Sequence, residues 1–435
     1  MKKVWDKWTR IALVKRILVG LILGAILGIA VPQATGIAIL GDVFVSALKA
    51  IAPLLVFFLV ISSLCNAGKS HGGVIKTVII LYMFSTVLAA VIAVFASMAF
   101  PVKMTLANAA TDTSAPQGIV EVLNNLLLNV VANPVSSLVN ANYVGILMWA
   151  VLLGLAFRAA DKMTKKVLAD VADGISMVVT WIINLAPFGI FGLVFNTVST
   201  NGLDIFTTYG KLLLLLVGCM LFIYFVTNPL LVYWCIRQNP YPLIFHCLKR
   251  SALTAFFTRS SAANIPVNMK VCEEMGLDRD TYSVTIPLGA TINMDGAAIT
   301  ITVMTMATAF TLGIHVDIPT AIILSLLAAL SACGASGVAG GSLLLIPMAC
   351  SLFGISDDIS MQVVAVGFII GVVQDSVETA LNSSSDLLYL LPQNSDSGDL
   401  KGKRLNLNKI AMSETVVRYG RPFFYVIGNY SVMFL

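Results

Sequence analysis

Long apolar runs alternate with short polar loops through the first half of the 435-residue chain. A helix needs about 20 largely apolar residues to cross the hydrocarbon core of a bilayer. Runs of roughly this kind predict six membrane-spanning helices, at Ile17–Pro32, Val43–Leu64, Thr77–Phe100, Val144–Phe157 (with part of the segment before it), Ile175–Phe195 and Leu212–Trp234. The hydropathy pattern therefore predicts an all-α polytopic membrane protein.

Two segments of the second half are interrupted in the middle by small and polar residues. In Pro240–Asp280 the interruption is Thr258–Asn264, and in Thr320–Phe353 it is Ser331–Gly341. The stretches on either side are too short to cross the bilayer comfortably, so each segment predicts a re-entrant helical hairpin. Each hairpin is followed by a full span with polar residues at mid-membrane depth. A hairpin and a polar span that occur twice predict inverted repeats.

These two polar spans carry the groups that hydrocarbon tolerates least. Val284–Leu312 contains Gly289–Gly296, which reads Gly-Ala-Thr-Ile-Asn-Met-Asp-Gly and predicts a helix that unwinds locally. The last span, Met361–Leu391, has acidic and polar residues along one stripe of a helix: Asp375, Glu378, Thr379, Asn382 and Asp386. An unpaired charge at this depth costs at least ~2.5 kcal/mol, so both spans predict a functional site.

Composition and charge agree with a membrane protein. The sequence is 58% hydrophobic and only 11% charged, whereas soluble domains carry about 25% charged residues. The net charge of +5 needs no nucleic acid partner, because much of the excess of Lys and Arg lies in the N-terminal segment and in short loops. This bias predicts a cytoplasmic N-terminus. The first apolar run lacks a clear Ala-x-Ala cleavage site and is followed by further spans, so it is expected to stay as a helix.

The rival class is an enzyme, but the sequence lacks the catalytic base and the zinc ligands that such an enzyme would need. Gly334-Ala335-Ser336-Gly337 matches the Gly-x-Ser-Gly of intramembrane serine proteases, but no histidine follows His315 to act as general base. The seven cysteines and three histidines show no zinc-site spacing. We therefore expect a protein that is not an enzyme, and the paired hairpins favour a carrier over a sodium channel.

Four motifs carry a family resemblance. They are Thr258-Arg259-Ser260-Ser261, Gly289–Gly296, the small-residue stretch Ser331–Gly341 and the stripe from Asp375 to Asp386. In this order they resemble the dicarboxylate/amino acid:cation symporters, the glutamate-transporter family, over roughly residues 10–391. Within that family the chain is most similar to the bacterial sodium:serine/threonine symporters.

The resemblance implies a glutamate-transporter-like elevator fold of eight transmembrane helices and two re-entrant hairpins, assembled as a homotrimer in the bilayer. Scaffold helices 1–2 and 4–5 would occupy residues 1–76 and 101–200. The transport domain would combine helix 3, residues 77–100, with helix 6, hairpin 1, helix 7, hairpin 2 and helix 8, residues 201–391. Residues 392–435 depart from the short polar tail of the family, and the polar composition of Gln393–Lys409 predicts a disordered tail. The expected location is the bacterial inner membrane, with both termini in the cytoplasm.

Binding roles for individual residues also follow from the resemblance, with Na⁺ as the co-transported ion. One sodium site would use Gly289, Asn293, Asn382 and Asp386. A second would use Tyr82, Ser85, Thr86, Asn293 and Asp295. A third would use Thr291 and Met294 with carbonyls of Ala332, Cys333 and Ala335. Oxygen ligands of this kind suit a hard alkali cation.

The substrate is expected to bind between the last span and the hairpin tips. Its ammonium group would meet Asp375 and Thr379. Its carboxylate would meet Asn382, Ser261 and hairpin-tip amides such as that of Gly337, because the N-terminus of a helix favours anions.

Two departures from the acidic-amino-acid members bear on the substrate. Glu378 stands where those members have an arginine, and Ala297 stands where they have a threonine. A glutamate repels a side-chain carboxylate and cannot clamp it. We therefore predict uptake of small neutral amino acids, serine or threonine, with a sodium- or proton-coupled acidic amino acid or dicarboxylate symporter as the alternative. Arg259 is expected to pair with Glu378 or Asp375 and neutralise the pocket.

Overall fold

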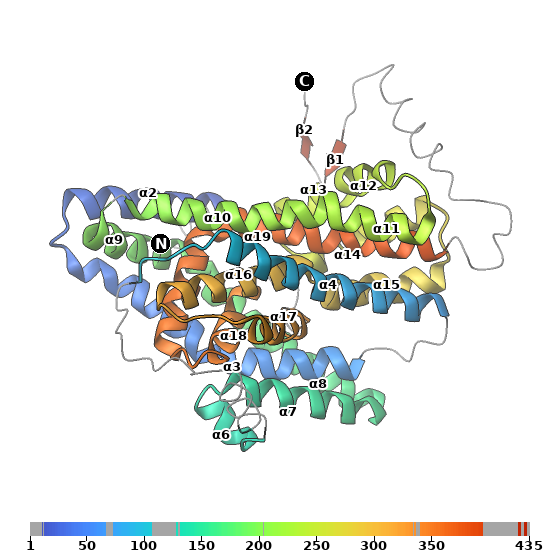
Figure 1. The fold of residues 1–435 in the computed structure, drawn as a ribbon, viewed down its shortest axis with the longest axis horizontal. Helices are drawn as coiled ribbons and strands as arrows, with labels where there is room; N and C mark the ends of the chain where they lie inside the picture. Colours follow the sequence, from blue (N-terminus) through green and yellow to red (C-terminus); the bar gives the residue numbers. More distant parts are fainter. Residues whose placement is uncertain are drawn as a thin grey trace.

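The computed structural model describes residues 11, 13–66, 73–106, 128, 131–202, 204–333, 335, 340–394, 425–427 and 430–432. Long helices form most of this part of the chain and run side by side along the longest dimension of the molecule (Figure 1). Six helical stretches within it are long and apolar enough to cross a membrane, at Thr35–Asn66, Val74–Ala99, Lys162–Asn184, Phe206–Ile236, Thr281–Thr311 and Asp357–Leu390. The chain is a multi-pass helical membrane protein.

A first helix group comes mostly from the N-terminal half. Its members are α2 (Leu13–Ala30), the 3-10 turn η1 (Thr35–Ala38), α3 (Ile39–Asn66), α6 (Pro134–Val139), α7 (Tyr143–Ala156), the 3-10 turn η2 (Phe157–Ala159), α8 (Lys162–Asn184) and α9 (Ala186–Asn201). Helix α3 packs against α7, α8 and α9, while α2 packs along α9. Figure 1 shows α3, α7 and α8 together at the lower edge of the molecule.

Three glycines at successive turns of α2 explain why α2 and α9 pack so closely. Gly20, Gly24 and Gly28 all face the backbone of α9. A Cβ atom at Gly20 would stand 2.2 Å from the carbonyl oxygen of Pro187, and one at Gly24 would stand 2.6 Å from that of Phe191. Small residues at every fourth position let two membrane helices approach backbone to backbone, where dispersion contacts are densest.

A second helix group contains α4 and everything from α10 onward. Its members are α4 (Gly73–Ala99), α10 (Asp204–Phe222), the π turn η3 (Ile223–Thr227), α11 (Asn228–Ile236), α12 (Tyr241–Cys247), the π turn η4 (Leu248–Ala252), α13 (Leu253–Thr258), α14 (Ser261–Glu274), α15 (Arg279–Ile292), α16 (Asp295–Thr311), α17 (Ile318–Ala332), the 3-10 turn η5 (Ser342–Leu345), α18 (Ile346–Ser351) and α19 (Asp357–Asn394). Helix α19 lies at the centre and packs against α4, α10, α13, α14, α15 and α16.

The breaks predicted in the second half are present. Helices α13 and α14 meet at Arg259 and Ser260, where the left-handed backbone of Arg259, with φ of 54°, ends α13. The side chain of Ser260 caps α14 by accepting a hydrogen bond from the backbone N–H of Ala263. Helices α15 and α16 are separated by Asn293 and Met294, which confirms the predicted local unwinding. Helix α17 is likewise separated from η5 and α18.

One predicted element was wrong. The apolar run Ile175–Phe195 does not form a single helix, because α8 ends at Asn184 and α9 begins at Ala186. Pro187 lies in the first turn of α9. Proline lacks the N–H that a continuous helix needs and crowds the turn before it, so the helix ends there although the run is largely apolar.

The tail beyond α19 contributes two short strands. Helix α19 continues to Asn394, and β1 (Tyr425–Ile427) pairs with β2 (Tyr430–Val432) as an antiparallel hairpin. The remaining residues of the predicted tail lie outside the described part of the chain.

Candidate functional site

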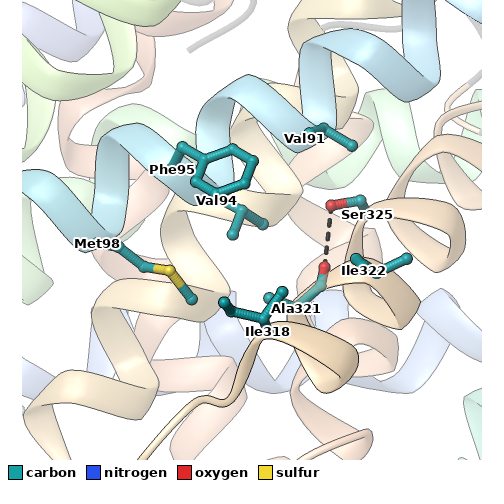
Figure 2. Close-up of a pocket in the computed structure, with 8 residues that line it drawn as sticks. All are labelled: Val91, Val94, Phe95, Met98, Ile318, Ala321, Ile322 and Ser325. Carbon is teal, nitrogen blue, oxygen red and sulfur yellow. Dashed lines mark hydrogen bonds between the residues drawn. The ribbon is translucent and has the colours of Figure 1, made fainter.

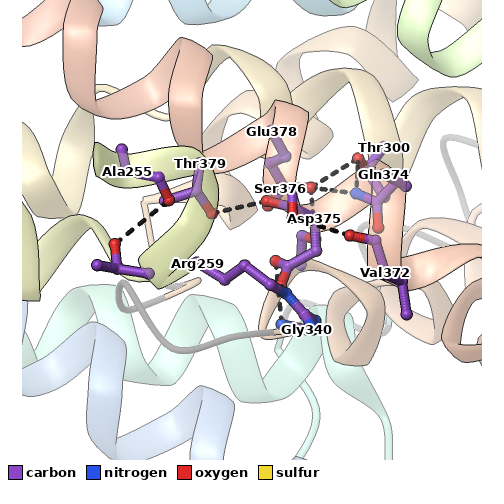
Figure 3. A network of polar contacts seen from close by, with 12 residues as sticks. Ala255, Arg259, Thr300, Gly340, Val372, Gln374, Asp375, Ser376, Glu378 and Thr379 are labelled. Atoms are coloured by element: carbon purple, nitrogen blue, oxygen red, sulfur yellow. Dashed lines mark hydrogen bonds and ion pairs between the residues drawn. The ribbon is translucent and has the colours of Figure 1, made fainter. Parts of the chain in front are cut away.

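The centre of the candidate site is an ion pair between the first hairpin tip and α19. The Nε atom of Arg259 donates to Oδ2 of Asp375 at 2.6 Å. The other carboxylate oxygen, Oδ1, accepts a hydrogen bond from the backbone N–H of Gly340 at 3.1 Å. Figure 3 shows Arg259 reaching across to Asp375, with Gly340 below it. Asp375 therefore joins both hairpins, and of the two predicted partners of Arg259 it is the one that the guanidinium meets.

Glu378 lies one helical turn further along α19 and is surrounded by hydrogen-bond donors. Its Oε2 atom accepts hydrogen bonds from Thr300 at 2.7 Å and from Ser342 at 2.9 Å. Gln374 donates to the same oxygen and, at 2.7 Å, to the Thr300 hydroxyl (Figure 3). Gly296 packs directly on Glu378, since a Cβ at Gly296 would stand 2.9 Å from the Glu378 Cα. The carboxylate is thus fixed by α16, η5 and its own helix.

The other predicted substrate residues lie around Asp375 and Glu378. The hydroxyl of Thr379 donates to the backbone carbonyl of Asp375 at 2.7 Å. The Oδ1 atom of Asn382 accepts from the backbone N–H of Gly296 at 2.7 Å. Ser261 is buried at the first position of α14, and Ala297 is buried beside Gly296 in α16. Gly337 lies outside the described residues.

Asn293 and Asp386 form a second centre at the break between α15 and α16. The amide nitrogen of Asn293 donates to Asp386 Oδ1 at 2.9 Å, to Ser385 Oγ at 2.8 Å and to the Asn382 carbonyl at 3.3 Å. The remaining oxygens, Asn293 Oδ1 and Asp386 Oδ2, are buried and have no hydrogen-bond donor among the described residues. Gly289 lies against this pair, with room for no more than a hydrogen atom: a Cβ there would stand 2.5 Å from Asp386 Oδ1.

Asp295 forms a third centre with the hydroxyls of α4. Its Oδ2 accepts from Ser85 at 2.8 Å and its Oδ1 from Thr86 at 3.2 Å. Two members predicted for the same cation site point elsewhere. Tyr82 donates its hydroxyl to the Asp386 carbonyl at 3.0 Å, and the Asn293 side chain faces Asp386. Both therefore join the second centre.

The third predicted cation site is described only in part. The Sγ atom of Cys333 lies 3.7 Å from the Ile292 carbonyl, so the second hairpin reaches the end of α15. The hydroxyl of Thr291 donates to Leu288 in its own helix, and the Met294 N–H donates to Thr86. Ala332 and Ala335 are buried at the tip, whereas 334 and 336–339 lie outside the described residues.

Charge is unbalanced across the three centres. Four acidic side chains of the described residues are buried, namely Asp295, Asp375, Glu378 and Asp386. Of these four, Asp375 alone forms an ion pair with a basic side chain of the described residues. A carboxylate removed from water without a partner costs several kcal/mol, so the other three need donors, protons or cations. This arrangement can attract and hold cations.

An apolar pocket between α4 and α17 is a different feature (Figure 2). It is lined by Val91, Val94, Phe95, Met98, Ile318, Ala321, Ile322 and Ser325. Its one hydroxyl, that of Ser325, already donates to the Ala321 carbonyl at 2.9 Å. A space of about 20 Å³ holds little more than one water molecule. The pocket offers neither the room nor the polar groups for an amino acid.

Several polar residues of the site were not singled out from the sequence. Thr300, Ser342 and Gln374 hold Glu378, and Tyr389 contacts Ser85. Gln374 and Tyr389 could have been predicted from the sequence, because they lie within one helical turn of Glu378 and Asp386 respectively. Thr300 and Ser342 could not, since hydroxyl residues are common in membrane helices and usually bond to their own backbone.

A bundle of apolar helices that encloses carboxylates, amides and hydroxyls at a broken helix defines a membrane carrier for small polar solutes and ions. The chain belongs to the sodium:dicarboxylate symporter family, whose profile it matches over residues 13–390. Family membership places it among transporters, and the intramembrane serine protease is set aside.

Two relatives show how close the match is. A serine/threonine transporter, SstT, of Bifidobacterium adolescentis is 58% identical over 390 residues, which is 89% of this chain and 91% of the relative. A protein of the same name from Streptococcus thermophilus is 55% identical over 390 residues, covering 89% of this chain and 97% of the relative.

Proposed function

We propose that the chain takes up serine and threonine by coupling their entry to the inward movement of sodium. The observation that carries sodium coupling is the pair Asn293 and Asp386, where two buried oxygens face no donor among the described residues. A buried acceptor without a donor is costly, and a hard cation is the partner that oxygen atoms of this kind favour. The names of the relatives support the substrate.

The three cation sites are proposed with the ligands predicted from the sequence, adjusted to the geometry. Asn293 and Asp386 would hold one sodium with the carbonyls of Gly289 and Asn382. Asp295 would hold another with Ser85 and Thr86, whose oxygens already lie around its carboxylate. The third would use the end of α15 and the tip of α17, which Cys333 brings together.

The substrate would bind beside the ion pair of Arg259 and Asp375. Its ammonium group would share Asp375 with the guanidinium, and its carboxylate would meet Asn382, Ser261 and the hairpin tips. Glu378 supports a neutral substrate, because a buried carboxylate 5% exposed repels an acidic side chain at short range. Ala297 adds only a methyl group beside Gly296, which packs on Glu378.

Transport would proceed by an elevator movement of the second helix group against the first. The packing supports this division, since α2, α3, α7, α8 and α9 contact mainly one another, as do α4 and α10–α19. The second group holds every residue of the proposed sites. We extend the proposal to eight transmembrane helices with two re-entrant hairpins, a homotrimer, and a bacterial inner-membrane location with cytoplasmic termini.

Uptake of labelled serine into proteoliposomes tests the proposal. An inward sodium gradient should drive accumulation, and excess threonine, but not aspartate, should compete. Asp386→Asn keeps the side-chain shape and removes the charge, so it should raise the sodium concentration needed for half-maximal uptake. Uptake that is independent of the gradient would remove the sodium coupling. Strong competition by aspartate would remove the neutral substrate.

A further inference from the structure

A buried chain of hydrogen bonds leads away from Asp295 through Ser85 to Tyr389 and Asn228, two residues that no proposed site uses. Ser85 Oγ lies 2.8 Å from Asp295 Oδ2 and 2.6 Å from the hydroxyl of Tyr389. That hydroxyl lies 2.8 Å from Oδ1 of Asn228. All four residues are at most 1% exposed, and they come from α4, α16, α19 and α11. The chain therefore crosses the second helix group from the cation site to a closed end at Asn228.

Two hydroxyl hydrogens cannot serve all three contacts while Asp295 is an unprotonated acceptor. A hydroxyl has one hydrogen, and its direction is set by the network around it. If Ser85 donates to Asp295 and Tyr389 donates to Asn228, the Ser85–Tyr389 contact of 2.6 Å has no hydrogen. Two oxygen lone pairs at that distance repel each other.

A cation between Asp295 and Ser85 supplies the contact for which no hydrogen is available. The cation takes the lone pair of Ser85, whose hydrogen turns to Tyr389, and Tyr389 then donates to Asn228 Oδ1. All three contacts are then filled. Without the cation, the direction reverses if the Asn228 amide turns over, because its nitrogen can donate to Tyr389, which donates to Ser85 and so to Asp295. That nitrogen is buried and has no acceptor among the described residues.

We propose that Tyr389 and Asn228 form a reversible hydrogen-bond chain that sets the direction of the Ser85 hydroxyl and so tunes cation binding at Asp295. The inference rests on the proposed sodium coupling. Tyr389 and Asn228 are positioning residues, since neither is a ligand. An amide suits the closed end of the chain because it offers both a donor and an acceptor.

Local structure holds both residues in place. Asn228 follows directly on the π turn η3, and such turns shift the side chains after them by inserting an extra residue. The ring of Tyr389 packs edge-on against that of Tyr82, with centroids 6.1 Å apart. The tyrosine hydroxyl is thereby fixed between Ser85 and Asn228 with little freedom to find other partners.

Sodium-dependent thermal stabilisation of the purified protein tests the inference without any amino acid substrate. Sodium chloride is titrated against choline chloride at constant ionic strength, because an ion that binds only the folded state raises Tm by mass action. Tyr389→Phe should raise the half-saturating sodium concentration roughly tenfold, the value of one hydrogen bond. Asn228→Leu should do the same. Tyr209→Phe is the matched control, since the buried Tyr209 hydroxyl bonds to the side chain of Thr197 in α9, and neither residue belongs to a proposed site.

A double mutant separates positioning from general destabilisation. If Tyr389 acts through Ser85, Tyr389→Phe should change sodium dependence no further in a Ser85→Ala background. A wild-type sodium response in both Tyr389→Phe and Asn228→Leu would overturn the inference. An equal further loss in the Ser85→Ala background would also overturn it. A wild-type protein that sodium does not stabilise would instead contradict the proposed sodium coupling.

Discussion

The Nε atom of Arg259 lies 2.6 Å from Oδ2 of Asp375, although 116 positions separate the two residues in the chain. Both side chains are buried, at 10% and 3% exposure. The pair ties the tip of the first hairpin to the central helix α19. The same carboxylate is proposed to receive the substrate's ammonium group, so Asp375 would hold the substrate and the hairpin tip together.

Removing one partner of the buried Arg259–Asp375 pair should lower the free energy of unfolding by more than the intact pair contributes to it. Arg259→Gln leaves Asp375 buried alone and should lower the free energy of unfolding by about 3–5 kcal/mol. Arg259→Gln combined with Asp375→Asn should recover most of that loss, because no buried charge remains. Unfolding in denaturing detergent measures both.

The exposed pair of Arg250 and Glu274 serves as control. Its removal should cost about 1 kcal/mol or less, because water screens exposed ion pairs. A double mutant of Arg259 and Asp375 that is as unstable as Arg259→Gln alone would contradict the burial argument.

Reversing the charge at Glu378 should admit acidic substrates. Glu378→Arg replaces an acceptor of three hydrogen bonds with a donor fork that can clamp a carboxylate. Aspartate should then compete with serine for uptake, and serine uptake should fall. Glu378→Gln removes the repulsion without supplying a clamp, so aspartate should stay a weak competitor. Unchanged serine preference in Glu378→Arg, with no gain of aspartate binding, would refute this role.

A single methyl group at Gly289 should disturb the Asp386 centre. The added Cβ would stand 2.5 Å from Asp386 Oδ1 and 3.1 Å from the ring of Tyr82. Gly289→Ala must therefore displace the carboxylate, and the half-saturating sodium concentration for uptake should rise at least about tenfold, or 1.4 kcal/mol.

Gly218→Ala, in α10, is the matched control. A Cβ there meets no atom within 4 Å. Its effect should be neutral or a stabilisation of about 0.5–1 kcal/mol, as expected for alanine in a helix. Equal sodium dependence in the two variants would mean that Gly289 does not shape the centre.

The cap of α17 should make stability depend on acid pH. Asp317 accepts hydrogen bonds from the Thr320 side chain and from the Thr320 backbone N–H, and these two bonds hold the pKa of its carboxyl below the usual range. Stabilisation from a lowered pKa is complete above the unfolded value, about 3.9, and is lost as pH falls through the folded value. Asp317→Ala should therefore cost about 1 kcal/mol at neutral pH and less below about pH 4.

Melting temperatures measured from pH 7 downward show this difference between the wild type and Asp317→Ala. Asp317→Asn keeps the cap without a titrating group, so its difference from Asp317→Ala should persist in acid. A constant difference between the wild type and Asp317→Ala at every pH would exclude the capping carboxylate as its cause.

The sequence predicted the polar positions of the site well because hydrocarbon leaves little other reason for them. Asp295, Asp375 and Asp386 stood out by depth alone, and the helix break at Asn293 followed from its small and polar neighbours. Pairing was harder to predict. Two partners were open for Arg259, Asn293 was assigned to both the Asp386 and the Asp295 centres, and Tyr82 was assigned to the Asp295 centre although its hydroxyl donates to the Asp386 carbonyl. Side-chain direction depends on helix rotation, which packing between helices determines.

The helix boundary at Leu185 was missed for a different reason. The run Ile175–Phe195 is apolar on both sides of Pro187, and hydropathy averages over a single proline. Pro187 explains the position of the break, and the start of α9 then packs against the glycines of α2. A window of hydrophobicity contains no information on such backbone contacts.

The break at Asn293 and Met294 divides one span into two helix dipoles that meet end to end. The last turn of α15 presents carbonyls, equivalent to about half a negative charge, beside Asp386, whereas the first turn of α16 presents N–H groups and about half a positive charge to Asp295. The backbone thus offsets the charge of Asp295 and adds to that of Asp386. Of the two carboxylates, Asp386 depends more on an external cation, so the sodium proposed at that position would stabilise the broken helix itself.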